Sequence, residues 1–126
     1  MPDINILVVD DEKEIADLIE IYLVSDGYKV FKAENAEAGL SILDKQDIHL
    51  VLLDIMMPVM NGLEASRQIR SLSRPDGNMI PILAMTAQDA ISVSSQCRQY
   101  GMDDYVLKPA DPEQLTKMIL KYVKTI

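Results

Sequence analysis

The sequence is poor in cysteine and has no long hydrophobic run. Its 126 residues include one cysteine, Cys97, so no disulfide can form within the chain. The longest apolar stretches, such as residues 6–9 and 50–53, are far shorter than the roughly 18 residues that indicate a membrane-spanning helix. The first residues also lack the basic and apolar regions of a signal peptide. We therefore expect a reducing, cytoplasmic location.

Basic residues are outnumbered by acidic ones. The chain has 12 Lys and Arg against 20 Asp and Glu, which gives a formal net charge of −8. Nucleic-acid phosphates and anionic lipid headgroups are bound mainly by Lys and Arg, so both repel an acidic domain. We expect this domain to bind neither nucleic acid nor membrane directly.

The composition is that of one folded unit. The hydrophobic fraction is 48% and the charged fraction is 25%, as in average soluble globular proteins. A chain of 126 residues falls within the usual size of a single domain. We therefore expect residues 1–126 to fold as one domain.

Five short apolar runs that predict strands alternate with segments of helical periodicity. The predicted strands are residues 4–9, 29–33, 50–53, 80–85 (or 82–85) and 105–107. The predicted helices lie around residues 15–23, 36–43, 69–72, 91–95 and 115–126. Asp111 followed by Pro112 is a favourable start for the last helix, as an N-cap with proline in the first helical position.

This alternation predicts an α/β fold. Strands that are apolar on both faces, such as residues 50–53, belong inside a parallel sheet that helices cover on both sides. Residues 29–33 alternate between polar and apolar, which is typical of an edge strand. With right-handed crossovers, these features favour a doubly wound, flavodoxin-like (βα)5 fold whose five-stranded parallel sheet has the order 2-1-3-4-5. Ligands of such sheets bind beyond the carboxyl ends of the strands next to the point where the winding reverses.

Four of the predicted strands end in polar side chains. Asp10 and Asp11 follow the first strand, Asp54 follows the third, Thr86 ends the fourth, and Lys108 follows the fifth. Because the carboxyl ends of parallel strands share one edge of the sheet, we expect these side chains to converge. Taken singly, each has an ordinary explanation, since an acid such as Asp11 often caps the helix that follows it. The joint pattern favours a site.

The residue types at this edge indicate chemistry on a phosphoryl group. Converging carboxylates repel each other, and a divalent cation relieves that repulsion. Oxygen ligands without His or Cys favour Mg²⁺, with Mn²⁺ as the alternative, and Mg²⁺ commonly binds carboxylates together with phosphate oxygens. Lys108 and Thr86 can contact further phosphoryl oxygens. Asp54 on the central strand is then the candidate nucleophile, which would form an aspartyl phosphate.

Four separated segments share a pattern with a known family. They are Asp10-Asp11, residues 54–62 (DIMMPVMNG), residues 81–87 (PILAMTA) and residues 101–109 (GMDDYVLKP). In their order and spacing they resemble the response-regulator receiver domains (CheY-like) of two-component signal transduction. The likeness extends over essentially the whole chain. It implies a phosphorylation-activated switch made of one receiver domain, residues 1–126.

The resemblance implies how the acidic residues would be used. Asp54 would accept a phosphoryl group from the phosphohistidine of a sensor histidine kinase or of a histidine phosphotransfer protein. Mg²⁺ would be held by Asp11, Asp54 and the backbone carbonyl of Met56, with Asp10 acting mainly through water. The domain would be a signalling phosphoacceptor rather than an enzyme, although it would catalyse its own phosphotransfer and a slow autodephosphorylation.

The resemblance also implies a conformational switch. Thr86 and Lys108 would contact the phosphoryl group, and a cis peptide bond would join Lys108 to Pro109. Thr86 would move toward the phosphate and Tyr105 would rotate inward, which would reshape the surface of the fourth helix, fifth strand and fifth helix. That surface would be read by a downstream effector, by an attached output or kinase domain, or by a second copy in a phosphorylation-dependent homodimer.

Other functions share parts of the pattern. A small Mg²⁺-dependent phosphatase with an aspartate nucleophile usually has a second catalytic aspartate two residues later, where this chain has Met56, and it carries a cap domain. A flavodoxin-like flavin carrier has a phosphate loop rich in Ser, Thr and Gly after the first strand, where this chain has acids. A pseudo-receiver that binds its partners constitutively would be expected to lack some of the acids.

Three polar residues are expected to have no chemical role. His49, the only histidine, precedes a strand and lacks the exposed helical setting of a phosphodonor histidine. Asp103 and Asp104 are expected to lie in a solvated turn before the fifth strand. We assign these three residues no chemistry.

Overall fold

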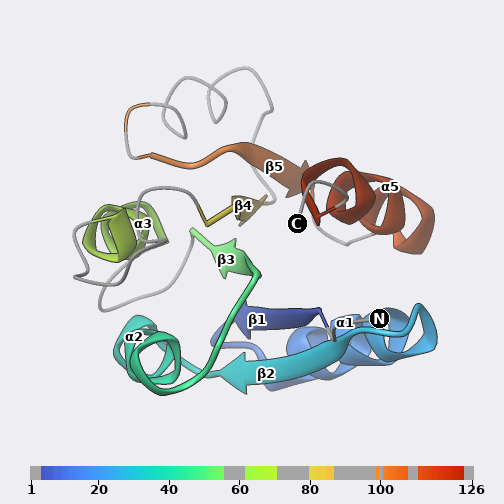
Figure 1. Ribbon diagram of the computed structural model, residues 1–126, viewed down its shortest axis with the longest axis horizontal. Coiled ribbons are helices and arrows are strands. Elements are labelled where there is room, and N and C mark those ends of the chain that lie inside the picture. The colour runs from blue at the N-terminus through green and yellow to red at the C-terminus, as the bar shows by residue number, and fades with distance from the viewer. Residues whose placement is uncertain are drawn as a thin grey trace.

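The computed structural model describes residues 4–55, 62–70, 80–86, 99, 101–107 and 111–123, and it shows a parallel sheet between two layers of helices (Figure 1). The strands are β1 (Asn5–Val9), β2 (Lys29–Ala33), β3 (Leu50–Asp54), β4 (Ile82–Thr86) and β5 (Asp104–Leu107). The helices are α1 (Lys13–Ser25), α2 (Ala36–Lys45), α3 (Gly62–Arg70) and α5 (Pro112–Val123). Neighbouring strands are parallel, in the order β2-β1-β3-β4-β5. The predicted fold class and strand order are confirmed.

The side chains of each strand divide between two hydrophobic layers, because successive residues point to opposite faces of a sheet. From β1, Leu7 and Val9 pack with α2 and α3, whereas Ile6 and Val8 pack with α1 and α5. Figure 1 shows the same division, with α2 and α3 on one side of the sheet and α1 and α5 on the other. All of β3 is buried, since both faces of this central strand are covered. Burial on both faces explains its unbroken apolar run.

β2 lies at an edge of the sheet, as its alternating sequence predicts. Lys29 and Lys32 of this strand are exposed, while Ala33 at its end is buried. Lys32 Nζ lies 2.7 Å from a carboxylate oxygen of Asp17 and 2.8 Å from one of Glu20, both in α1. The hydrogen bond from Lys32 lowers the pKa of Asp17. Lysines on an edge strand also discourage pairing with another chain.

Local sequence signals set the ends of several helices. Asn35 caps α2, because its side-chain oxygen accepts a hydrogen bond from the backbone N–H of Ala38 at 2.8 Å. Asp111 caps α5 in the same way through the N–H of Glu113, at 3.1 Å. α1 is followed by Gly27, whose φ of +94° suits a residue without a Cβ. The predicted N-cap at Asp111 is confirmed.

One expectation is half right: Asp103 precedes β5 and is exposed, as expected, but Asp104 does not share that turn. Asp104 is the first residue of β5. The carboxylate of Asp103 accepts hydrogen bonds from Arg70, 33 residues away, and from the backbone of Ile82, 21 residues away. A local pattern does not reveal such distant partners. The predicted helix around residues 91–95 lies outside the described residues.

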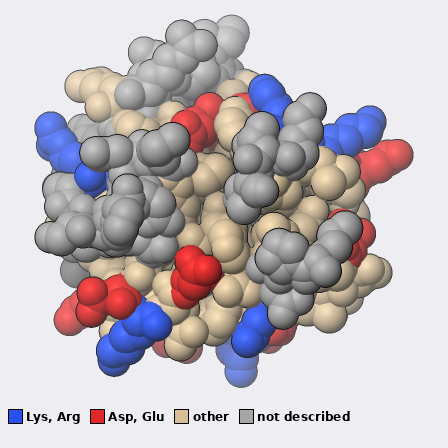
Figure 2. All heavy atoms as spheres, viewed as in Figure 1, with Lys and Arg blue, Asp and Glu red and all other residues tan. Residues whose placement is uncertain are grey.

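The surface of the described residues carries mixed charge. Figure 2 shows one face of the molecule, on which Lys and Arg are interspersed with Asp and Glu. Within the described part of the chain, no helix is long and apolar enough to cross a membrane.

Candidate functional site

Asp10 and Asp54 lie side by side at the carboxyl end of the sheet. β1 pairs with β3 so that Val9 is opposite Leu53, and each of these two residues is followed by one of the aspartates. Neighbouring strands are about 4.8 Å apart, so Asp10 and Asp54 occupy neighbouring backbone positions at this edge. Both aspartates are buried, each with 1% of its surface exposed. Carboxylates buried at adjacent positions are stable only with compensating hydrogen bonds or positive charge.

Backbone hydrogen bonds fix the orientation of Asp10. Its N–H donates to the carbonyl of Ala33 at 3.1 Å, which extends the β1–β2 pairing by one residue. Its Oδ1 accepts a hydrogen bond from the N–H of Glu12 at 2.9 Å. Glu12 occupies the N-cap position of α1, so helix capping does not account for Asp11.

Three consecutive acids form a cluster at this edge. Carboxylate oxygens of Asp10, Asp11 and Glu12 all lie within 4.8 Å of one another, and the last two residues are exposed. Such a set of oxygen donors suits a hard cation such as Mg²⁺. The sequence pattern singled out Asp10 and Asp11 but missed Glu12, whose signal was its position directly after them. Asp54 is not one of these three and adjoins them through the β1–β3 pairing.

Thr86 ends the next strand along the sheet. Asp54 pairs with Met85, so Thr86 lies one residue beyond the position opposite Asp54. Thr86 is fully buried, with 0% of its surface exposed, and it pairs in turn with Leu107 of β5. The structure therefore brings Asp10, Asp54 and Thr86 to the ends of three adjacent strands.

Several other predicted site residues lie outside the described residues. They are Met56, Lys108 and Pro109, so the metal-ligating carbonyl, the phosphate-binding lysine and the cis peptide bond stay predictions. Lys108 directly follows the last residue of β5. Tyr105, the second predicted switch residue, is partly buried and packs against the hydrophobic layer formed with α2 and α3.

A hollow of about 150 Å³ opens beside Asp10. It brings two lysines near the acidic site, and its lining is Asp10, Lys13, Ala16, Asp17, Lys32, Ala33 and Glu34. Hydrogen bonds to Asp17 and Glu20 raise the pKa of Lys32 above its ordinary value. The hollow beside Asp10 is therefore lined by both carboxylate and lysine side chains.

Comparison with known sequences assigns most of the chain to one family. Residues 6–120 match the family model described as the response regulator receiver domain. Over 111 residues, 88% of this chain, the sequence is 42% identical to regulatory protein VanR of Enterococcus faecium. The chain spans 46% of the length of that relative.

Solved structures give the same result. The fold matches the chemotaxis protein CheY4 of Vibrio cholerae with a TM-score of 0.91 at 26% identity, over 97% of this chain and 100% of that one. It also matches the receiver domain of sensor histidine kinase PA1611 from Pseudomonas aeruginosa, with a TM-score of 0.86 at 29% identity, over 98% and 99% of the two chains. That receiver domain has a magnesium ion coordinated in its active-site cleft.

Proposed function

This chain belongs to the response regulator receiver domains of two-component systems, and we propose that it is a phosphoacceptor switch whose acceptor is Asp54. The observation that carries the proposal is the burial of Asp54 at the end of the central strand, beside Asp10. A carboxylate held at a fixed place is preorganised for attack on phosphorus. Residues 1–126 are proposed to form a single such domain.

The proposed reaction moves one phosphoryl group from nitrogen to oxygen. A carboxylate oxygen of Asp54 attacks the phosphorus of a phosphohistidine. The new P–O bond gives an aspartyl phosphate while the P–N bond breaks, and the departing imidazole keeps the electron pair of that bond and takes up a proton. The donor is a sensor histidine kinase or a histidine phosphotransfer protein. Since the product stays on the chain, the domain acts as a signalling phosphoacceptor.

Asp11, Asp54 and the backbone carbonyl of Met56 are the proposed direct ligands of Mg²⁺, with Mn²⁺ as the alternative, and Asp10 would bind the cation mainly through water. The donor set fits, because the acids clustered at this edge offer only oxygen. When bound, the cation would neutralise negative charge on the carboxylates and on the phosphoryl oxygens. The magnesium ion in the PA1611 receiver domain supports this assignment. Glu12 lies close enough to contribute through water.

Thr86 and Lys108 are the proposed contacts of the remaining phosphoryl oxygens. The hydroxyl of Thr86 can donate a hydrogen bond, and the ammonium group of Lys108 is a compact positive charge. Movement of Thr86 toward the phosphate would be accompanied by an inward rotation of Tyr105. Lys108 and Pro109 are proposed to be joined by a cis peptide bond.

The switch would act on another protein or domain. We propose that the surface formed by the predicted fourth helix (around residues 91–95), β5 and α5 is read by a downstream effector, an attached output or kinase domain, or a second copy of the chain. The chain spans about half the length of VanR, so the regions of a relative that lie outside the receiver domain are not represented here. The choice among these three partners is left to experiment. The proposal includes the cytoplasmic location expected from the single cysteine.

Intact-mass spectrometry tests the acceptor. The wild-type chain is incubated with acetyl phosphate and Mg²⁺, next to Asp54→Asn and the control Asp47→Asn, whose carboxylate is exposed. We expect one phosphoryl adduct on the wild type and on the control, and none on Asp54→Asn, whose amide is a poor nucleophile. An adduct on Asp54→Asn would refute the assignment. Absence of any adduct would favour a constitutive binding module.

A further inference from the structure

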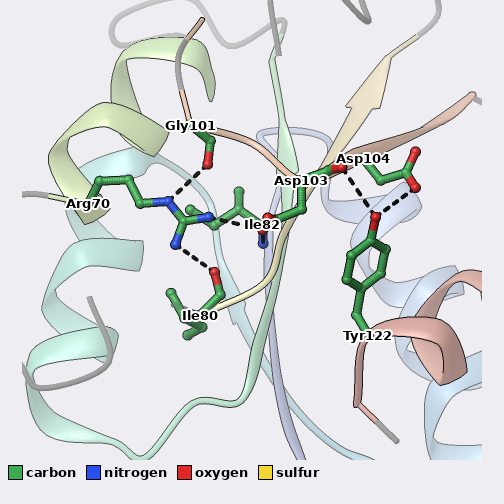
Figure 3. A network of polar contacts seen from close by, with 7 residues as sticks. All are labelled: Arg70, Ile80, Ile82, Gly101, Asp103, Asp104 and Tyr122. Carbon is green, nitrogen blue, oxygen red and sulfur yellow. Dashed lines mark hydrogen bonds and ion pairs between the residues drawn. The ribbon is translucent and has the colours of Figure 1, made fainter. Parts of the chain in front are cut away.

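Asp103 joins β5 to β4 at the end of the sheet opposite the acidic site (Figure 3). Its backbone N–H donates to the carbonyl of Ile82 at 2.9 Å. The N–H of Ile82 donates back to Asp103 Oδ2, also at 2.9 Å. One residue thus engages both backbone groups of the first residue of β4. A side chain that replaces a backbone partner in this way fixes which residue of β5 lies opposite which residue of β4.

Arg70, at the end of α3, holds Asp103 in place. Its Nη2 donates to Asp103 Oδ2 at 2.9 Å. The same guanidinium donates from Nη1 to the carbonyl of Ile80 at 2.7 Å and from Nε to that of Gly101 at 2.9 Å. Figure 3 shows the guanidinium between these acceptors. It therefore ties α3 to the segments that enter β4 and β5.

Glycine at position 101 allows this close approach. Gly101 has φ +85°, which favours a residue without a Cβ. An added Cβ would lie 3.1 Å from Arg70 Cγ, closer than ordinary contact. The absence of a side chain at Gly101 therefore leaves room for Arg70 to pack against the backbone that precedes β5.

β5 needs such a restraint because it is short and lies at the edge of the sheet. It has four residues, and β4 is its only neighbour in the described sheet. A slip of one residue turns every side chain to the other face, and each residue advances the strand by about 3.3 Å. Lys108 follows Leu107, which pairs with Thr86. A charged hydrogen bond spans only about 2.8 Å, so a slip of one residue would break any contact of Lys108 at the site.

We propose that Asp103, held by Arg70, is a positioning residue for phosphoryl transfer: it fixes the register of β5 on β4 and thereby sets where Lys108 enters the site. This inference rests on the proposed function. Asp103 lies at the end of the sheet opposite the acceptor and the metal-binding acids, so it acts only through β5, whose last residue, Leu107, directly precedes Lys108 in the sequence.

A double-mutant cycle on the rate of phosphoryl uptake tests the proposal. The variants are Lys108→Ala, Asp103→Ala and the two combined, with acetyl phosphate as donor and Mg²⁺ present. Lys108→Ala is expected to slow uptake by on the order of 10²-fold. Asp103→Ala is expected to slow it about tenfold through misplacement of the lysine. In the Lys108→Ala background, Asp103→Ala is expected to change the rate less than about twofold, because the group it positions is absent.

Two further variants separate positioning from loss of stability. Asp103→Asn keeps an acceptor for the N–H of Ile82 and should retain most of the wild-type rate. Asp104→Ala, the matched control, removes the neighbouring acid, which contacts Tyr122 rather than Ile82. It should lower stability and leave the effect of Lys108→Ala on the rate unchanged. All rates are measured at a temperature and in a buffer in which urea titrations show that every variant is folded.

The outcomes distinguish this inference from the proposed function. If the wild type takes up a phosphoryl group but Asp103→Ala slows uptake by the same factor in both backgrounds, or not at all, the positioning role is refuted and the proposed function stands. If the wild type takes up no phosphoryl group, the proposed function and the positioning role are both refuted. If Asp103→Ala does not fold, Arg70→Lys takes its place in the cycle, because lysine cannot reproduce the three-way contacts of the guanidinium.

Discussion

Replacing Tyr122 by phenylalanine should lower stability by an amount that depends on pH. The hydroxyl of Tyr122 donates to Asp104 Oδ2 at 2.9 Å and lies 3.2 Å from the carbonyl oxygen of Asp103 (Figure 3). Burial, the hydrogen bond to Asp104 and the charges of both acids raise the pKa of Tyr122 from 10.0 to about 12. Phenylalanine keeps the ring and its packing, so the substitution isolates the hydroxyl.

The magnitude follows from the pKa and the hydrogen bond. A shift of two pKa units corresponds to at most about 2.7 kcal/mol. Tyr122 is partly exposed, and solvent screening reduces this to about 1 kcal/mol, which is also the usual net contribution of a hydrogen bond. Because the pKa is raised in the folded state, this stability is fully present below about pH 10 and is lost as the pH rises toward about 12.

Urea unfolding followed by circular dichroism at a series of pH values measures this effect. At neutral pH, Tyr122→Phe should unfold with about 1 kcal/mol less free energy than the wild type, and the difference should shrink as the pH rises above about 10. Tyr22→Phe is the matched control, because Tyr22 packs against the same hydrophobic layer. A difference that stays constant with pH, or equals that of the control, would refute the reasoning.

Three other predictions concern the metal site and α2. Asp11→Ala should weaken Mg²⁺ binding far more than Asp103→Ala in a calorimetric titration, because only Asp11 belongs to the acidic cluster; equal losses would count against the metal site. Gly39→Ala should lower the free energy of unfolding by about 1–3 kcal/mol, although alanine favours helices, because its Cβ would lie 2.9 Å from Val9 Cγ2; a stabilised variant would show that Val9 yields easily. Asn35→Ala should cost about 1 kcal/mol in urea unfolding by removing the N-cap of α2, whereas an unchanged midpoint would mean that the cap contributes nothing.

Much of the fold could be predicted from the sequence because burial dictates residue type. β3 is covered on both faces and is apolar throughout up to Asp54, while the edge strand β2 alternates. These patterns, with the handedness of crossovers, suffice for the strand order. The same order brings Asp10, Asp54 and Thr86 to adjacent strand ends, so the core of the candidate site could be predicted as well.

What the sequence did not reveal depends on partners that are distant along the chain. Asp103 and Asp104 look like a polar turn, but their carboxylates bind Arg70 and Tyr122, on helices from opposite faces of the sheet. No periodicity records a contact between a strand start and a helix 33 residues earlier. Glu12 was missed for a different reason: exposed acids near a helix start are common, and its closeness to two aspartates becomes meaningful only in three dimensions.

The most direct test of the central claim is the site of phosphorylation. After incubation with a phosphohistidine donor and Mg²⁺, peptide mapping by tandem mass spectrometry should locate the phosphoryl group on Asp54, and brief treatment with alkali should remove it, as expected for an acyl phosphate. A phosphoryl group on Thr86, His49 or any other residue, or one on Asp54→Asn at the wild-type level, would contradict the account.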